Sequence, residues 1–92
     1  MQCLRIIIIV EKMDDLLFDF IQKNAQQNKI EGVVQAMGAD KIRIAACGTK
    51  QNMEDFMDAL HKGGPKVPDM SDFELEPFLK DKDFRGVFRV IR

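Results

Sequence analysis

The residues best placed to do chemistry lie where an aliphatic run, residues 6–10, leads into an amphipathic segment, residues 14–28. The run is typical of a strand buried on both faces, and the segment is typical of a helix. A strand that turns into a helix presents free backbone N–H groups at the positive helix end, which suits a phosphate or another anion. The connection here reads Glu11-Lys12-Met13-Asp14-Asp15, so carboxylates stand where the anion would bind. We predict a turn whose backbone suits an anion and whose charge opposes one.

Other candidate ligand or catalytic residues are few. His61 is the one histidine, and its place late in a predicted helix suits a partly exposed side chain near the negative helix end. Asp14, Asp15 and Asp19 could bind a hard cation, although helix capping explains the first two more simply. The sequence holds no Ser-His-Asp set, Cys–His pair or glycine-rich phosphate motif. It therefore predicts no metal site and no cofactor.

The elements that would position these residues follow from the hydrophobic pattern. It predicts helices over 14–28 and 49–62, and strands over 3–10, 30–37, 41–47, 72–76 and 86–92. On the first helix the predicted inward residues are Leu17, Phe20, Ile21 and Ala25, with Leu16 and Phe18 on the flanks. This order predicts an α+β, ferredoxin-like sandwich, in which a mostly antiparallel sheet of four or five strands carries two helices on one face.

Composition predicts one soluble domain over residues 1–92. The 14 basic and 15 acidic residues give a formal net charge of −1, which argues against nucleic acid or an anionic membrane as the main partner. No apolar run is long enough for a membrane span, and the N-terminal residues lack the cleavage site of a signal peptide. We expect a cytoplasmic protein.

Two cysteines, Cys3 and Cys47, fall in predicted strands. They are too few for a disulfide scaffold, and a cytosolic chain favours reduced thiols. In a ferredoxin-like sheet the first and third strands are antiparallel neighbours, so both residues are expected at the same end of the sheet, within bridging range. We predict neighbouring, free thiols, with a structural or redox disulfide as the alternative.

Four segments together give the chain a family resemblance. Residues 20–25 resemble an aromatic-Val-Gln-basic-x-Ala helix, residues 30–34 a Leu-x-Gly-Trp-Val strand, residues 41–48 a strand that ends in Gly before the second helix, and residues 84–92 a closing Phe-x-Gly-Phe-x-Ile-Arg with a short insertion. In this order and at this spacing the chain resembles the acylphosphatase family along nearly its whole length. The resemblance implies the ferredoxin-like fold that the element order also predicts.

The reaction of that family depends on two sets of residues, and this chain differs from the family at both. A Val-Gln-Gly-Val-x-Phe-Arg turn holds the phosphoryl oxygens through backbone N–H groups and the Arg, and an Asn shortly after Gly-Trp-Val positions the attacking water. By the resemblance, the Arg position falls on Phe18 and the Asn position on Ala36. The turn itself becomes Met13, Asp14, Asp15, Leu16 and Leu17.

Loss of these groups predicts loss of the reaction. Removing one preorganised donor typically raises the barrier by about 3–4 kcal/mol, and the added carboxylates repel the substrate. We therefore expect an inactive acylphosphatase-like domain that serves as a small binding or regulatory domain for an unidentified protein or small-molecule partner. The alternative is a divergent acylphosphatase that hydrolyses acyl phosphates to carboxylate and phosphate. Open edge strands near 72–76 and 87–92 allow a monomer or an edge-strand homodimer.

Overall fold

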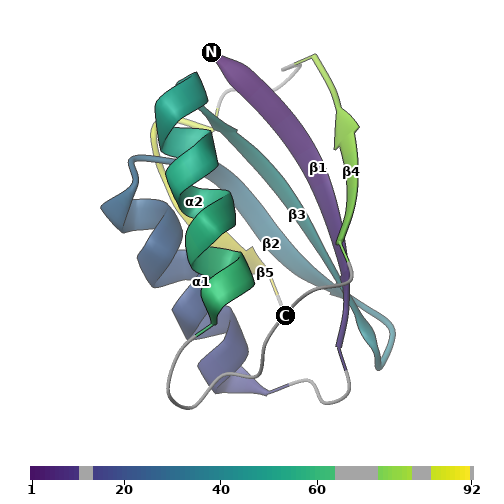
Figure 1. Ribbon diagram of the computed structural model, residues 1–92. Helices are drawn as coiled ribbons and strands as arrows, with labels where there is room; N and C mark the ends of the chain where they lie inside the picture. Colours follow the sequence, from purple (N-terminus) through teal and green to yellow (C-terminus); the bar gives the residue numbers. More distant parts are fainter. Residues whose placement is uncertain (11–13, 64–72, 80–83, 92) are drawn as a thin grey trace.

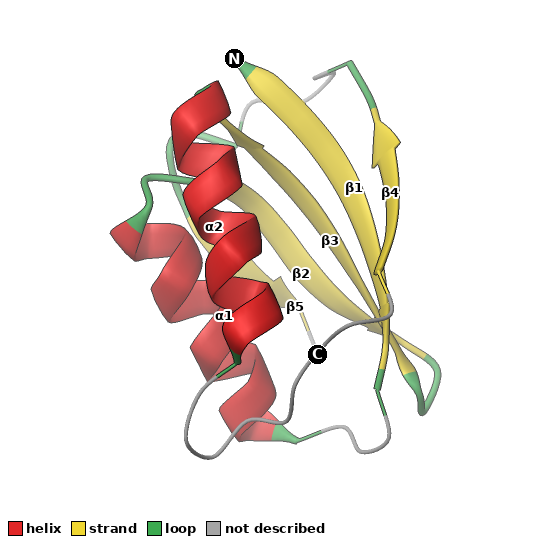
Figure 2. Cartoon of the chain, viewed as in Figure 1, coloured by secondary structure: helices red, strands yellow, loops and turns green. Residues whose placement is uncertain are grey.

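The computed structural model of the chain describes residues 1–10, 14–63, 73–79 and 84–91. Its strands are β1 (Gln2–Ile9), β2 (Glu31–Met37), β3 (Lys41–Gly48), β4 (Phe73–Pro77) and β5 (Phe88–Ile91), and its helices are α1 (Asp15–Gln27) and α2 (Lys50–Lys62). Both helices pack side by side on one face of the sheet (Figures 1 and 2). The predicted α+β, ferredoxin-like sandwich is confirmed. Glu11, Lys12 and Met13 of the predicted anion turn lie outside the described residues.

The sheet has the strand order β4-β1-β3-β2-β5. All neighbouring strands are antiparallel except β2 and β5, which run parallel. The order places β1 beside β3, as predicted, and leaves β4 and β5 at the two edges. Neither described helix is long and apolar enough to cross a membrane.

The core fills the space between the helices and the face of the sheet that they cover. Ile6 and Ile8 of β1 are fully buried there, whereas Ile9 is 50% exposed on the other face. The prediction that this run is buried on both faces is wrong, because no described element covers the second face of β1 as the helices cover the first. β1 therefore alternates like a half-buried antiparallel strand in spite of its unbroken aliphatic sequence.

α1 turns the predicted stripe to the core except at one position, where Phe18 is buried in place of Phe20. Its buried residues are Leu17, Phe18, Ile21 and Ala25. Phe18 is 3% exposed, Phe20 is only partly buried, and Leu16 is 52% exposed. Placing Phe18 on the flank was wrong: Phe18 lies three residues before Ile21, so it follows the helical period toward the core. The sheet beneath the helix decides between Phe18 and Phe20.

Cys3 and Cys47 stand opposite each other on β1 and β3 and are joined in a disulfide, with their Cα atoms 4.1 Å apart. The predicted proximity is confirmed, but the prediction of free thiols is wrong; the described residues include no free cysteine. Directly opposed positions of an antiparallel pair bring two side chains within reach of each other. The pairing register therefore brings the two cysteines close enough to bond, although the low cysteine count had argued against a disulfide.

A glycine lets β2 approach β3 closely. Gly32 has φ 146°, a backbone conformation that side chains rarely adopt, and a Cβ at this position would run into the carbonyl oxygen of Ala45. Glycine alone meets both conditions without strain. Gly32, which is part of the sequence resemblance, is thus required by the close packing of β2 against β3.

Candidate functional site

The predicted anion turn leads into α1 through a helix cap made by Asp14. Asp14 has extended backbone angles (φ −146°, ψ 167°), and its Oδ1 accepts a hydrogen bond of 3.0 Å from the backbone N–H of Leu17. Asp15 adds a second carboxylate in the first helical turn. These carboxylates already satisfy the donor and the positive helix end that would attract an anion. Capping by Asp14 was one of the predicted roles, and the structure shows it.

Phe18 lies inside the protein. Its side chain is 3% exposed and belongs to the main hydrophobic core, together with the neighbouring Leu17. An aromatic ring in this environment has neither the charge nor the access to hold a phosphoryl oxygen. Leu16, which is 52% exposed, is the one residue of the predicted turn after Asp15 that faces solvent.

Ala36 lies on the same covered side of the sheet. It stands opposite Ile42, which also stands opposite Ile8, and it packs against the core. The adjacent Gln35 points to the uncovered face, and its Oε1 accepts a 3.0 Å hydrogen bond from Arg43. The amide nearest to Ala36 in the sequence is therefore directed away from the helix-covered side.

The turn between β2 and β3 lies beside the end of β1. The backbone N–H of Val10 donates to the carbonyl of Asp40 at 2.8 Å, so the end of β1 is held beside the turn that follows β2. Phe18 is a member of the hydrophobic core, and Ala36 packs against that core. Both side chains are hydrocarbon, so neither offers a charge or a hydrogen bond.

The other candidate residues do not assemble into a site. His61 is exposed, with its ring centroid 4.4 Å from that of Phe73. In the described ranges no three His, Cys, Asp or Glu side chains are grouped so that they could hold a metal ion, and this includes Asp14, Asp15 and Asp19.

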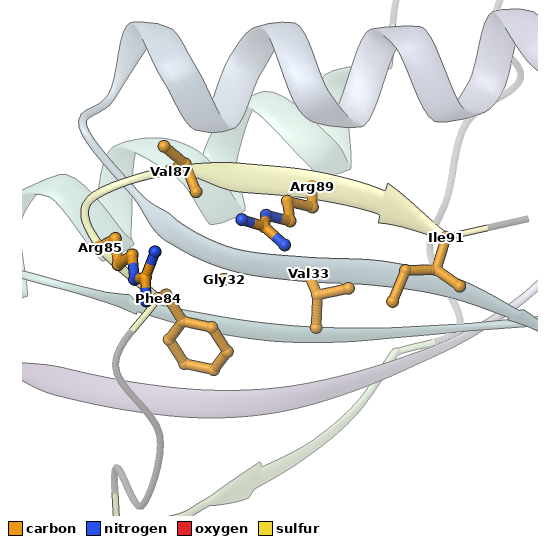
Figure 3. Close-up of a pocket in the computed structure, with 7 residues that line it drawn as sticks. All are labelled: Gly32, Val33, Phe84, Arg85, Val87, Arg89 and Ile91. Atoms are coloured by element: carbon orange, nitrogen blue, oxygen red, sulfur yellow. The ribbon is translucent and has the colours of Figure 1, made fainter.

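A feature that the sequence reasoning missed lies on the uncovered face of the sheet. A groove of about 440 Å³ is lined by Gly32, Val33, Phe84, Arg85, Val87, Arg89 and Ile91. Figure 3 shows Arg89 reaching from β5 over β2, with Arg85 and Phe84 at one end of the groove and Ile91 at the other. A second hollow of about 280 Å³ adjoins it and shares Val33 and Phe84.

Comparisons with known proteins agree on the fold. The family model described as acylphosphatase matches residues 18–89. The crystal structure of acylphosphatase from Bacillus subtilis is 21% identical, covers 100% of both chains and has a TM-score of 0.83. An acylphosphatase from Coxiella burnetii is 18% identical, covers 98% of this chain and 92% of its own, and has a TM-score of 0.82.

The same fold also occurs within a larger protein. T. kodakarensis HypF is 19% identical and matches 100% of this chain with 12% of its own length, at a TM-score of 0.80. Likeness at these identities shows the fold. A comparison with curated proteins found no match.

Proposed function

This chain belongs to the acylphosphatase family, and we propose that it is a catalytically inactive member that acts as a small binding or regulatory domain. Fold alone does not decide activity, because the family's reaction depends on particular side chains and on a backbone turn. The proposal therefore depends on what stands at those positions in this chain.

The observation that carries the proposal is the burial of Phe18. By the resemblance, this position is that of the Arg that holds the phosphoryl oxygens, and its side chain is 3% exposed within the core. Phosphoryl transfer depends mainly on positioning and on charge stabilisation. A buried aromatic ring supplies neither, and it leaves no room at that position for a cation.

The charge before α1 supports the same proposal. Asp14 occupies the N–H of Leu17, and Asp15 places a further negative charge in the first turn. An incoming acyl phosphate would have to displace the Asp14 carboxylate from the N–H of Leu17, and the chain holds that carboxylate close to its donor. The negative charges of Asp14 and Asp15 would also repel the phosphate. Ala36, at the position of the water-orienting Asn, offers no hydrogen bond from its side chain.

The alternative is that the chain is a divergent acylphosphatase. Its full-length likeness to the B. subtilis acylphosphatase favours this reading, because the whole architecture that carries the family's site is retained. It requires another cation and another water-orienting group to act at the end of the sheet near Asp14.

A phosphate titration tests whether the turn before α1 has kept an anion site. We expect the backbone amides of Leu16, Leu17 and Phe18 to show no saturable chemical-shift change with millimolar inorganic phosphate, because Asp14 already accepts from this helix end. The control is a titration with chloride at matched ionic strength. Saturable shifts that are confined to these amides and specific to phosphate would contradict the proposal.

A further inference from the structure

The arginines of the described chain gather on the sheet face that the helices leave uncovered. Arg5, Arg43, Arg85 and Arg89 all line the two adjoining hollows on that face. The strand register explains why Arg5 and Arg89 share one face: Arg5 pairs with Ala45, Ala45 with Val33, and Val33 with Arg89. These positions form one row across four strands, so residues far apart in the sequence share one surface.

The two hollows form one surface, which we call the arginine groove. They share Val33 and Phe84, and have volumes of about 440 Å³ and about 280 Å³. The groove is partly aliphatic: Val87 is 43% exposed and Ile91 46% exposed beside the arginines. Exposed apolar side chains next to arginines are typical of the surfaces through which proteins bind one another.

Two arginines of the groove, Arg43 and Arg89, carry positive charge that no described carboxylate neutralises. Among the described residues the one ion pair is Arg5 with Glu76, at 3.4 Å, so neither Arg43 nor Arg89 has a described carboxylate within 4.0 Å. The helices carry the exposed acids Asp15, Asp19, Glu54, Asp55 and Asp58, which outnumber their exposed lysines Lys23, Lys50 and Lys62. A molecule of net charge −1 thus keeps a positive sheet face and a negative helix face. This separation steers an acidic partner to the groove.

The edges of the sheet are poorly suited to receive an added strand. On β4, Pro77 lacks an N–H, and Glu74 and Glu76 put negative charge along the strand. On β5, the carbonyl of Phe88 accepts a 3.0 Å hydrogen bond from the Gln22 side chain of α1. A partner is therefore better received on the face of the sheet than at its edges.

We propose that the arginine groove docks a protein segment that presents carboxylates beside aliphatic side chains. The proposal deepens the proposed binding function and rests on it. Carboxylates pair with the exposed guanidinium groups of Arg43 and Arg89, and aliphatic side chains cover Val33 and Ile91.

Single-stranded nucleic acid fits the groove less well. Its binding depends on neutralising phosphates and on stacking bases, and sheet-type RNA-binding modules place aromatic side chains on the strands. Here the strand positions beneath the groove are aliphatic, glycine, alanine, glutamine or arginine, and Phe78 and Phe84 come from outside the strands. Glu74 and Glu76 are exposed at the border of the face.

The test is fluorescence anisotropy with a labelled peptide of alternating glutamate and leucine, on the whole domain. The test variant is Arg43→Glu with Arg89→Glu. The matched control is Lys23→Glu with Lys50→Glu, which makes the same change of charge at exposed helix positions. We expect saturable binding that the groove variant weakens about tenfold or more and that the helix variant changes less than about twofold. Thermal unfolding of both variants establishes that they are folded.

Three results would overturn the proposal. One is the absence of saturable binding, and another is equal weakening by both double variants. The third is tighter binding of an oligothymidine to the same arginines, which would make the groove a nucleic-acid surface. Acyl phosphate hydrolysis is measured on the same samples. Activity that survives Arg43→Glu with Arg89→Glu would refute the inactive-domain proposal and leave the docking result standing.

Discussion

Breaking the Cys3–Cys47 disulfide is expected to lower the free energy of unfolding by about 4 kcal/mol. The bridge joins residues 44 positions apart and fixes β1 to β3 in the middle of the sheet. A cross-link over a loop of this length restricts the unfolded chain, and the chain-entropy relation gives the expected size of the effect. Because the free energy of unfolding of a domain is typically about 5–15 kcal/mol, this loss is a large share of the total stability.

The measurement is urea unfolding of the protein with and without a thiol reductant. The matched control is Cys3→Ala with Cys47→Ala, which has no bridge to lose, so reductant should leave its unfolding midpoint unchanged. Two titratable thiols in the denatured, unreduced protein, or a natural-chain midpoint that reductant does not move, would show that the bridge is absent or contributes nothing.

Restoring the family residues at both replaced positions is expected to damage the protein rather than to activate it. Phe18→Arg with Ala36→Asn should cost about 3–5 kcal/mol of unfolding free energy, because the Phe18 ring is 3% exposed and its loss leaves a cavity or a buried charge. A guanidinium that reaches the surface would meet Asp14 and Asp15, which compete with phosphate for it.

Urea unfolding and phosphate titration of the double variant measure the two effects separately. Phe18→Leu keeps an apolar side chain at the same position and is the control for the introduced charge; it should cost clearly less than the arginine. A double variant that is as stable as the natural chain and binds millimolar phosphate saturably, with both aspartates intact, would contradict this account.

Much of the fold could be predicted from the sequence because its local signals agree with one another. The helical spacing, the glycine turns and the β-branched runs place all seven elements within a few residues of their observed bounds. Their order then leaves few topologies, and the neighbouring positions of Cys3 and Cys47 follow from the chosen one. The disulfide between the cysteines was not predicted, because the low cysteine count and the expected cytosolic location both favoured free thiols. The disulfide also weighs against the cytoplasmic location expected from the sequence.

The remaining errors have a common cause, which is that a pattern along the chain does not say what covers each face. Five consecutive aliphatic residues, 6–10, suggest a strand buried on both sides, yet Ile9 is exposed because the helices cover the other face of β1. On α1 the sequence allows either Phe18 or Phe20 in the apolar stripe, and only the sheet selects Phe18 over Phe20. The outward direction of Arg43 could be predicted from alternation along its strand, but the presence of Arg89 on the same face depends on the parallel pairing of β5 with β2.

The central claim is that this acylphosphatase-fold domain has lost the family's reaction, and the rate of hydrolysis of acetyl phosphate tests it most directly. We expect the purified protein to release phosphate no faster than the spontaneous reaction, at any protein concentration used. A turnover of about one per second or faster, abolished by substitutions among residues 14–18, would contradict it.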